Sequence, residues 1–580
     1  MWNLFPTNMA RIRHASPWEA WLSSLEKQRT DLDQFLFQFS PSLLIIAAIS
    51  CFVMITWLIQ AIHRTARRLQ DKGWKQTVAM IVTDLPGIRP IVQKEQAKVV
   101  SNLRKDIMKG RGEKKVKTFL TLPEASQGKR TLVKCLEERR KILGDVAYST
   151  RGSQASGAIY MGDKALMDLL NSVYSEYSLA NPMHADMFPS VREMEAEVVM
   201  MTAGLVGGGG TDSQNVCGSM TSGGTESILT AVKASRDYMA ATRGIQHPEM
   251  IVAPSAHAAF IKASEYFKIR LVKAQLDGDY CLRGRSVEKH VNRNTIMVVA
   301  SAPGYPHGVM DDVPSIARVC KRYKIMLHVD ACLGGFVLPF LRKIEHYDIP
   351  PFDFSVDAVT SMSLDTHKFA CSHKGTSIVL YRSPDIRRYQ YTTVTDWSGG
   401  LYISPGFAGS RSGALIATAW AALLYHGMDG YIENTKRMMA CSSMLIDAIN
   451  NNMKNQLKVI GNPIMSVIAF TAMNDPNTSK PVLNIYVVND IMASKGWKLS
   501  ALQSPPALHM CFTPAHSESL TQDLIDDLSD AVTEAARRES EGNQDEDQGM
   551  APLYGMAAKV PDRRIVGNFL IAYQDILLEP

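Results

Sequence analysis

Short apolar runs that alternate with helical segments dominate the middle of this chain and constrain its fold most strongly. The runs are rich in β-branched residues and have the length of buried strands. Predicted strands lie at 250–252, 269–272, 296–300, 325–329, 359–364 and 377–381, with helices at 256–267 and 315–323. Strands that alternate with helices pair in parallel, so we expect an α/β domain with a central, mostly parallel sheet. Functional groups should then gather where the strands end.

The pattern changes after about Gly430. A long helix is expected to continue to Ile449, strand-like runs follow at 459–468 and 482–488, and another helix is expected at 519–538. This mixture predicts a smaller α+β domain. Residues 539–548 are acidic and poor in apolar side chains, so we expect a linker before a short C-terminal segment.

One uncharged segment near the N-terminus, Ser42–Ile59, predicts a membrane anchor. As a helix it would span roughly 27 Å, about the thickness of a hydrocarbon core. Five basic residues follow it, namely Arg64, Arg67, Arg68, Lys72 and Lys75. By the positive-inside rule we expect a luminal N-terminus and a cytosolic main body in a single-pass protein, with the endoplasmic reticulum as its membrane.

These patterns divide the chain into six parts. We expect a luminal segment at 1–41, a transmembrane helix at 42–62, a linker with helical segments at 63–156, a large domain at 157–430, a small domain at 431–538 and a linker with a C-terminal segment at 539–580. The formal net charge of +6 is too small to require a nucleic-acid partner. The nine cysteines are scattered and form no CxxC pair, which predicts reduced thiols and no metal site.

Three motifs lie at the ends of predicted elements and suit one kind of chemistry. Lys368 follows a strand within Asp-Thr-His-Lys, where loss of water would lower the pKa of its amine and prepare it for Schiff-base formation. Asp330 ends another strand and could pair with a protonated pyridine nitrogen. Gly223 and Gly224 precede a predicted helix whose N-terminus could hold a phosphate group. Taken singly, these residues are more often a surface lysine, a helix cap and an ordinary turn.

A histidine between small residues could complete this set. His257 lies in Ser-Ala-His-Ala-Ala, where its ring has room to lie flat against a planar cofactor. The alternative is a histidine that caps a helix or lies in the core.

Taken in order, these motifs resemble the group II pyridoxal-phosphate decarboxylase superfamily of fold type I. Within it, Asn-Pro-Met-His-Ala-Asp-Met-Phe-Pro from Asn181, Pro-His-Gly-Val from Pro306 and Thr-Asp-Trp from Thr395 look like the sphingosine-1-phosphate lyase family. The resemblance covers about 157–513 and includes the N-terminal anchor. It implies pyridoxal 5'-phosphate as cofactor and a homodimer with its sites at the interface. It also implies retro-aldol cleavage of a phosphorylated sphingoid base to a fatty aldehyde and ethanolamine phosphate.

The same resemblance implies roles for individual residues. Lys368 would bind the cofactor covalently, Asp330 would pair with its ring nitrogen, and His257 would stack on the ring. The cofactor phosphate would be held by Gly224, Thr225, His367 and, from a loop contributed by the partner chain, Ser410. The substrate would be surrounded by Tyr160, Asn181, His184, Tyr305 and Lys374, and Tyr160 or a group near Lys374 would carry protons.

Two departures from the family pattern leave alternatives open. Ser412 and Ala414 replace a proline and a glycine in the partner loop, and the run Phe369–His373 replaces a stretch that carries two tyrosines. A membrane-anchored pseudoenzyme that acts as a scaffold is therefore one alternative. The other is an amino-acid decarboxylase on the same fold, although Asn181, His184 and Lys374 suit a phosphate-bearing substrate.

Overall fold

The computed structural model describes residues 73–112, 128–143, 154–160, 163–207, 216–541 and 560–578, and short stretches before residue 70. Most of the expected transmembrane helix at 42–62 and of the linker at 539–548 lies outside these residues. Within the described ranges, no helix combines the length and apolar character needed to cross a membrane. The described residues belong to two compact units, one drawn from Met1–Asp106 and Val560–Glu579 and the other from Ile107–Lys559.

A seven-stranded mixed sheet forms the centre of the larger unit. Its strands are β1 (Cys217–Thr221), β2 (Glu249–Val252), β3 (Arg270–Lys273), β4 (Thr295–Ser301), β5 (Met326–Asp330), β6 (Val359–Leu364) and β7 (Ser377–Tyr381). Their spatial order is β1-β7-β6-β5-β4-β2-β3. Strands β2 to β6 pair in parallel, as predicted, whereas β7 runs antiparallel to both of its neighbours. The sequence patterns had not indicated β1, which forms one edge of the sheet.

Both faces of this sheet are buried, which explains why its strands read as continuous apolar runs. Successive residues of β4 point to opposite faces. Val298 and Ala300 join one hydrophobic core, whereas Met297 and Val299 join another. Helix α10 (Val313–Tyr323) contributes to the first core, and helices α7 (Gly224–Arg243) and α8 (Ala258–Phe267) contribute to the second.

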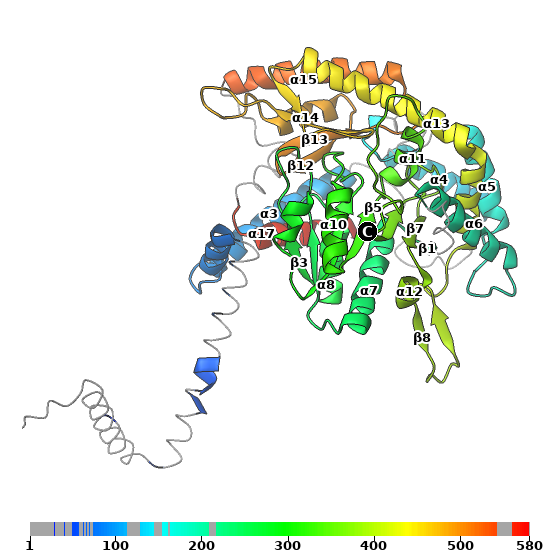
Figure 1. Ribbon diagram of the computed structural model, residues 1–580. Coiled ribbons are helices and arrows are strands. Elements are labelled where there is room, and N and C mark those ends of the chain that lie inside the picture. Colours follow the sequence, from blue (N-terminus) through cyan, green and yellow to red (C-terminus); the bar gives the residue numbers. More distant parts are fainter. Residues whose placement is uncertain are drawn as a thin grey trace, which may run out of the picture. The chain divides into compact units, whose positions relative to one another are not determined.

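Further helices surround the sheet. They are α4 (Lys129–Leu143), α5 (Lys164–Glu176), α6 (Pro189–Leu205), α9 (Gly284–Glu288), α11 (Leu338–Leu341), α12 (Pro384–Arg387) and α13 (Gly413–Asn451), with short 3-10 turns at Gly334–Phe336 and Arg388–Gln390. Figure 1 shows α13 passing from the side of α5 and α6 toward α15 (Glu518–Ser540). The helix is broken at Gly427, whose φ of 54° is left-handed. This break lies close to the domain boundary expected at Gly430, and the domain boundaries themselves stay predictions.

A second, antiparallel sheet follows in the chain. Its order is β10 (Leu457–Val459), β11 (Val467–Ala472), β13 (Pro506–Cys511) and β12 (Ser500–Gln503). The strand expected at 482–488 was wrong, because helix α14 (Ile485–Ser494) begins there. Asn484 caps this helix by accepting a hydrogen bond from the N–H of Tyr486, and the apolar run is buried as one face of a helix instead of as a strand.

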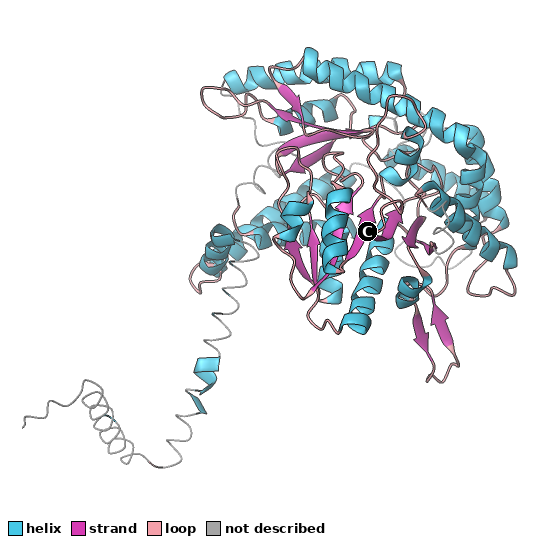
Figure 2. Cartoon of the chain, in the orientation of Figure 1, coloured by secondary structure: helices cyan, strands magenta, loops and turns pink. Residues whose placement is uncertain are grey.

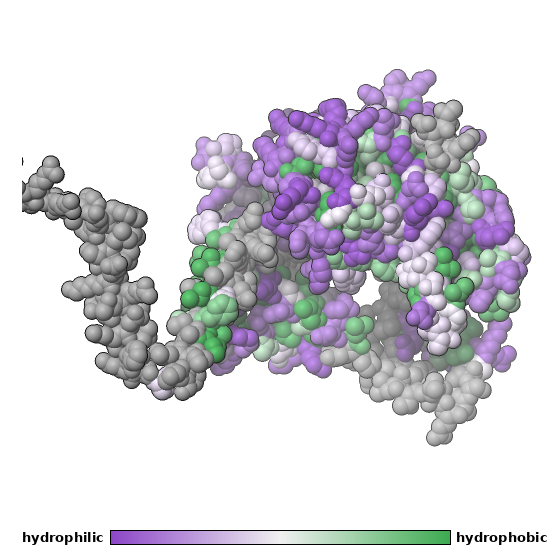
Figure 3. Space-filling view, turned by 60° about the horizontal axis from the view of Figure 1, so that its bottom comes forward, coloured by the Kyte–Doolittle hydropathy of each residue, from purple (hydrophilic) through white to green (hydrophobic). Residues whose placement is uncertain are grey.

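The hairpin of β8 (Thr392–Val394) and β9 (Tyr402–Ser404) projects from the body of the larger unit (Figure 2). It carries exposed apolar side chains, among them Trp397 and Leu401. Elsewhere the face turned to the viewer in Figure 3 is largely hydrophilic. The apolar side chains of this unit are thus mainly enclosed in the cores around its two sheets.

The smaller unit joins distant parts of the chain. It contains a helical segment at 73–83, part of α3 (Arg89–Gly112) and the C-terminal helix α17 (Arg563–Leu578). Arg564 contacts both Asp84, with N–O distances of 3.0 and 3.1 Å, and Asp562, with its closest contact at 2.7 Å. Thr83 donates a further hydrogen bond to Asp562 at 2.6 Å. The sequence patterns predicted the N-terminal helices but not their pairing with the C-terminal segment.

Candidate functional site

The turn between β1 and α7 forms the first part of the site. Gly223 and Gly224 connect Thr221, the last residue of β1, to the 20-residue helix α7. A Cβ at Gly224 would lie 2.7 Å from Oδ1 of Asp365, so only glycine fits at this close approach. Thr221 Oγ1 lies 2.6 Å from Ser227 Oγ in the first turn of α7, which ties the helix to the sheet. The N–H groups at such a helix start favour an anion.

Lys368 lies on the turn after β6, and its ammonium is paired with a carboxylate. Nζ lies 2.9 Å from Oδ2 of Asp365, whose side chain is only 2% exposed. Burial by itself lowers the pKa of Lys368, but Asp365 outweighs this effect and the pKa is raised. The expected lowering of this pKa was therefore wrong for the protein alone, because an opposite charge against a buried amine favours its charged form.

Asp330 ends β5 and is held by two hydrogen bonds to one of its oxygens. Oδ1 accepts the backbone N–H of Cys332 at 3.1 Å and the hydroxyl of Ser363, on β6, also at 3.1 Å. Ser363 Oγ lies 3.2 Å from Nε2 of His328, and Nδ1 of that imidazole lies 2.9 Å from Ser361 Oγ. All four side chains come from the same face of two adjacent parallel strands, in which His328 pairs with Ser361 and Asp330 with Ser363.

The direction of these hydrogen bonds follows from counting protons. Burial lowers the pKa of His328 to about 4, so its imidazole carries a single proton near neutral pH. Ser363 uses its only proton toward Asp330, so Nε2 of His328 must be the donor to Ser363. Nδ1 is then bare and must accept the proton of Ser361. Every hydroxyl and ring proton in this buried chain therefore points toward the carboxylate of Asp330.

Tyr160 lies beside Lys374 and near Cys511, the last residue of β13. Nζ of Lys374 lies 4.6 Å from the centre of the Tyr160 ring, and the thiol of Cys511 interacts electrostatically with the phenol. Burial is the main cause that raises the pKa of Tyr160 well above 10, so the phenol stays protonated near neutral pH. The pKa of Lys374 is lowered, by partial burial and then by the charge of Lys368.

The structure also places the remaining predicted residues. Nδ2 of Asn181 donates to Ser410 Oγ at 3.2 Å, which joins two loops far apart in the sequence. His367 donates through Nδ1 to the carbonyl of Thr376, and Nε2 lies 3.8 Å from Asp365. Thr225 lies in the first turn of α7.

Three predicted residues lie in more open positions. The ring centres of Tyr305 and His509 lie 4.8 Å apart. His184 is exposed, and its backbone N–H donates to the carbonyl of Asn181 at 3.0 Å. His257 is exposed and caps α8, because its Nδ1 accepts the N–H of Ala259 at 3.2 Å. The capping role that we considered for His257 is therefore confirmed, while its stacking role stays a prediction.

The three motifs singled out in the sequence converge on one place. Cys332 follows β5, and its N–H binds Asp330. Its Sγ lies 3.0 Å from the point where a Cβ added to Gly224 would stand. Its thiol interacts electrostatically with Asp330, Asp365 and Lys368. The glycine turn, the strand-end carboxylate and the lysine thus surround a single thiol.

Sequence reasoning missed several residues of this site. Asp365 was overlooked although it belongs to the same motif as Lys368. His328 and Ser363 were overlooked as well, although polar residues inside otherwise apolar strands are a usable signal, because a buried polar group needs a partner. Cys511 carried no signal that distinguishes it from an ordinary buried cysteine.

Comparisons with known proteins agree with this geometry. Residues 123–473 match the pyridoxal-dependent decarboxylase conserved domain. Sphingosine-1-phosphate lyase of Arabidopsis thaliana is 41% identical over 562 residues, which cover 95% of this chain and 98% of that protein. Sphingosine-1-phosphate lyase 1 of Mus musculus is 36% identical, with 98% of this chain and 96% of that protein covered. The solved structure of a sphingosine-1-phosphate lyase from Burkholderia pseudomallei has a TM-score of 0.68 and 37% identity, and covers 73% of this chain and 95% of that one.

Proposed function

Because this chain belongs to the sphingosine-1-phosphate lyase family of the pyridoxal-dependent decarboxylases, we propose that it cleaves the C2–C3 bond of phosphorylated sphingoid bases. The products are a long-chain aldehyde and ethanolamine phosphate. The chain is accordingly a pyridoxal-phosphate-dependent carbon–carbon lyase. One structural observation supports the proposal independently of the sequence similarity: Lys368, Asp330 and the Gly224 turn lie together around Cys332.

The residues at this place fit pyridoxal phosphate. Lys368 supplies the amine, the start of α7 supplies backbone donors for a phosphate group, and Asp330 supplies a carboxylate for a ring nitrogen. Within the described residues, Oδ1 of Asp365 is buried and accepts no hydrogen bond. A buried polar atom without a partner indicates that the site has hydrogen-bonding capacity that the protein alone does not use.

Each residue has a distinct task in the reaction. When bound, pyridoxal phosphate supplies an aldehyde that condenses with amines and a ring that withdraws electrons. Asp365 orients the ammonium of Lys368 at 2.9 Å, and this lysine must lose a proton before it can act as a nucleophile. Asp330 would pair with the ring nitrogen while Ser363 and Cys332 hold its Oδ1. Lys368 would hold the cofactor through its aldehyde, the group with which a substrate amine can also condense.

The two groups beside Lys368 divide the proton transfers. The raised pKa of Tyr160 keeps its phenol protonated, so Tyr160 suits proton donation. The lowered pKa of Lys374 makes this amine the better acceptor for the proton of the substrate C3 hydroxyl. Phe369, where the family carries a tyrosine, packs edge-on against Tyr160 with ring centres 5.0 Å apart. The run Phe369–His373 differs from the family pattern, which is why we considered a scaffold without activity. Phe369 nevertheless keeps an aromatic ring at this position.

The location and assembly of the protein are also proposals. We propose that residues 42–62 anchor the chain in the endoplasmic reticulum membrane, with the N-terminus in the lumen and the catalytic unit in the cytosol. The uncharged run and the basic residues that follow it support this topology. We also propose a homodimer in which the loop around Ser410 reaches the partner's site.

A direct assay tests the proposed function. Purified full-length protein loaded with pyridoxal phosphate is incubated with a phosphorylated sphingoid base, and the aldehyde and ethanolamine phosphate are quantified by mass spectrometry. Wild-type protein should form both products in equal amounts, and Lys368→Ala should form neither. Parallel incubations with amino acids measure carbon dioxide release. Decarboxylation without aldehyde formation would favour the decarboxylase alternative, and cofactor binding without any turnover would favour the scaffold.

A further inference from the structure

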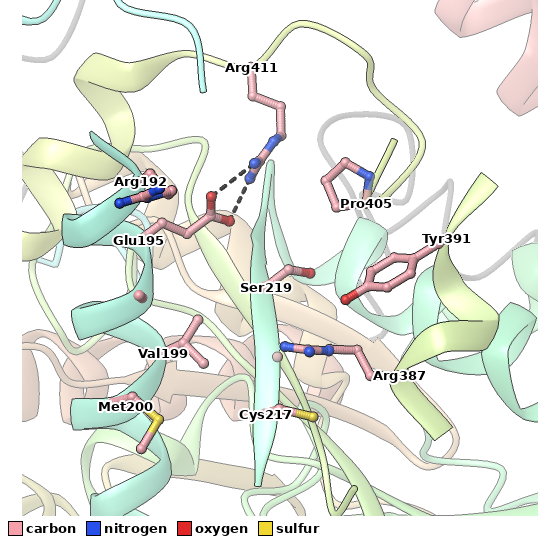
Figure 4. Close-up of a pocket in the computed structure, with 12 residues that line it drawn as sticks. Arg192, Glu195, Val199, Met200, Cys217, Ser219, Arg387, Tyr391, Pro405 and Arg411 are labelled. Carbon is pink, nitrogen blue, oxygen red and sulfur yellow. Dashed lines mark hydrogen bonds and ion pairs between the residues drawn. The ribbon is translucent and has the colours of Figure 1, made fainter. Parts of the chain in front are cut away.

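A cavity of about 310 Å³ lies beside β1, apart from the residues around Lys368. Figure 4 shows its walls: α6 with Arg192 and Glu195 on one side, β1 with Cys217 and Ser219 at the centre, and Arg387 and Tyr391 on the other side. Its volume is at the lower end of the range for small-molecule sites. Apart from Arg411, which belongs to the loop around Ser410, the residues of this cavity have no part in the proposed reaction.

The charges in the cavity do not cancel. Arg411 forms two hydrogen bonds with Glu195, at 2.6 and 2.8 Å, and Arg192 pairs with Glu193 at 2.6 Å. Arg387 points toward β1 in Figure 4. Its Nε is buried without a hydrogen-bond partner among the described residues. Among the described residues this guanidinium forms no ion pair, and its central carbon lies 5.9 Å from the centre of the Tyr391 ring. A cation in such a half-buried position is costly unless an anion compensates it.

The groups around Arg387 add hydrogen-bond donors. Ser219 Oγ accepts the side-chain amide of Gln390 at 2.9 Å, so its own proton remains available. Glu195 accepts the N–H of Met220 at 3.0 Å on the free edge of β1. Because strand N–H groups alternate in direction, the N–H of Gly218 points to the same edge. A hydroxyl, a backbone N–H and a guanidinium that has no carboxylate partner among the described residues thus face a cavity that an acidic group would complement.

We propose that this cavity is a second anion site that takes the phosphate group of a small phosphomonoester. Arginine matches phosphate because its planar donors bind two oxygens at once. The apolar side chains of Val199 and Met200 line the same cavity, so they would contact a short carbon stem. The cavity is separate from the residues around Lys368 of the same chain, and Arg411 in its wall belongs to the loop that we propose to reach the partner's site.

Phosphate-dependent stabilisation of the full-length, cofactor-loaded protein tests the proposal. The probes are inorganic phosphate and, separately, ethanolamine phosphate, each compared with sodium chloride at equal ionic strength. The Tm of the wild type should rise with probe concentration, because a ligand that binds only the native state stabilises it. Arg387→Gln should weaken the apparent affinity by about tenfold or more, as expected for loss of a charge-assisted bond. A response to ethanolamine phosphate but not to inorganic phosphate, if it is lost in Arg387→Gln and kept in Lys374→Met, identifies the organic stem as part of the ligand.

Arg388→Gln is the matched control, since Arg388 is the next residue, loses the same charge and is bound to Asp385 on the surface. It should keep the wild-type response. Ser219→Ala, which removes a neutral donor, should give an intermediate loss and serves if Arg387→Gln folds poorly. Lys374→Met, which alters the proposed substrate site, should retain the response, so failure of the proposed reaction and failure of this site are distinguishable. Equal responses in wild type and Arg387→Gln would overturn the proposal. So would dissociation of an oligomer by Arg387→Gln in sedimentation, which would show that a second copy fills the cavity.

Discussion

Removing the hydroxyl of Ser363 should weaken cofactor binding more than its small change in volume suggests. Ser363→Ala deletes the donor that binds Oδ1 of Asp330 at 3.1 Å and the acceptor that binds Nε2 of His328 at 3.2 Å. His328 is fully buried, so its N–H has no water to replace the lost acceptor. The substitution thus releases the carboxylate and leaves a buried donor unpaired.

The expected magnitudes follow from these two losses. A hydrogen bond to a charged group contributes about 1.5–3 kcal/mol, and an unsatisfied buried N–H costs about 1–3 kcal/mol. The two effects are not fully additive because they share one hydroxyl, so we expect the free energy of unfolding to fall by about 2–4 kcal/mol. If about 1.4 kcal/mol of this loss weakens the interaction between Asp330 and the cofactor, the dissociation constant of pyridoxal phosphate rises about tenfold.

Two measurements on the same variants separate positioning from stability. Urea denaturation of the protein without cofactor gives the free energy of unfolding, and titration with pyridoxal phosphate followed by visible absorption gives the dissociation constant. Ser361→Ala is the matched control, because it breaks the hydrogen bond at the far end of the chain without touching Asp330. It should lower stability and leave cofactor affinity within about twofold of the wild type, while Ser363→Thr should restore both properties. Equal cofactor affinity in Ser363→Ala and Ser361→Ala would refute the reasoning.

Four further outcomes are expected. Lys368→Ala should lower the free energy of unfolding of the cofactor-free protein by about 3–5 kcal/mol in urea denaturation, because Asp365 becomes an unpaired buried charge; adding Asp365→Asn should recover most of this loss. The free energy of unfolding falls between pH 7 and pH 5, and this fall should be about 2 kcal/mol smaller in His328→Phe than in the wild type. The reason is that the unfolded histidine binds a proton near pH 6.5, whereas the buried one, with a pKa of about 4, does not. Gly224→Ala should lower stability by about 1–3 kcal/mol and weaken cofactor binding in the pyridoxal phosphate titration, because its Cβ would lie 2.7 Å from Asp365. Gly204→Ala is the control. It has open space around its Cβ and should be nearly neutral. Tyr160→Phe should lower kcat by about 10²–10⁴-fold with cofactor affinity unchanged, as expected for a proton donor; an unaltered kcat would exclude Tyr160 from proton transfer.

Local patterns in the sequence were sufficient for much of the fold. The predicted strands at 359–364 and 377–381 coincide with β6 and β7, and the helix predicted at 315–323 lies within α10. These elements succeed because each is buried on both faces or along one stripe, so its apolar period is visible in the chain itself. The run at 482–488 failed for the same physical reason, since a short apolar run does not distinguish a buried strand from a buried helix.

The individual residues of the candidate site were predictable, because each lies at the end of a single strand or in a single turn that the sequence itself reveals. Lys368, Asp330 and Gly224 could be selected because together they supply the groups that one cofactor needs, although each alone has an ordinary structural use. Their convergence, however, depends on strand order and register, which a single chain pattern does not contain. The pairing of Asp330 with Ser363, 33 positions apart, exists only because β5 and β6 are neighbours in that register.

Residue types and their order along the chain determined the kind of chemistry, because a cofactor amine, a ring partner and a phosphate turn each require particular functional groups. Only the tertiary structure decided the electrostatic state of those groups. It placed Asp365 against Lys368 and so raised the pKa of an amine that desolvation alone would lower. It also directed the protons of His328 and Ser363 toward Asp330, and left Arg387 beside β1 with no ion pair among the described residues. Charges interact through space according to distance and burial, and neither quantity is written in the order of the residues.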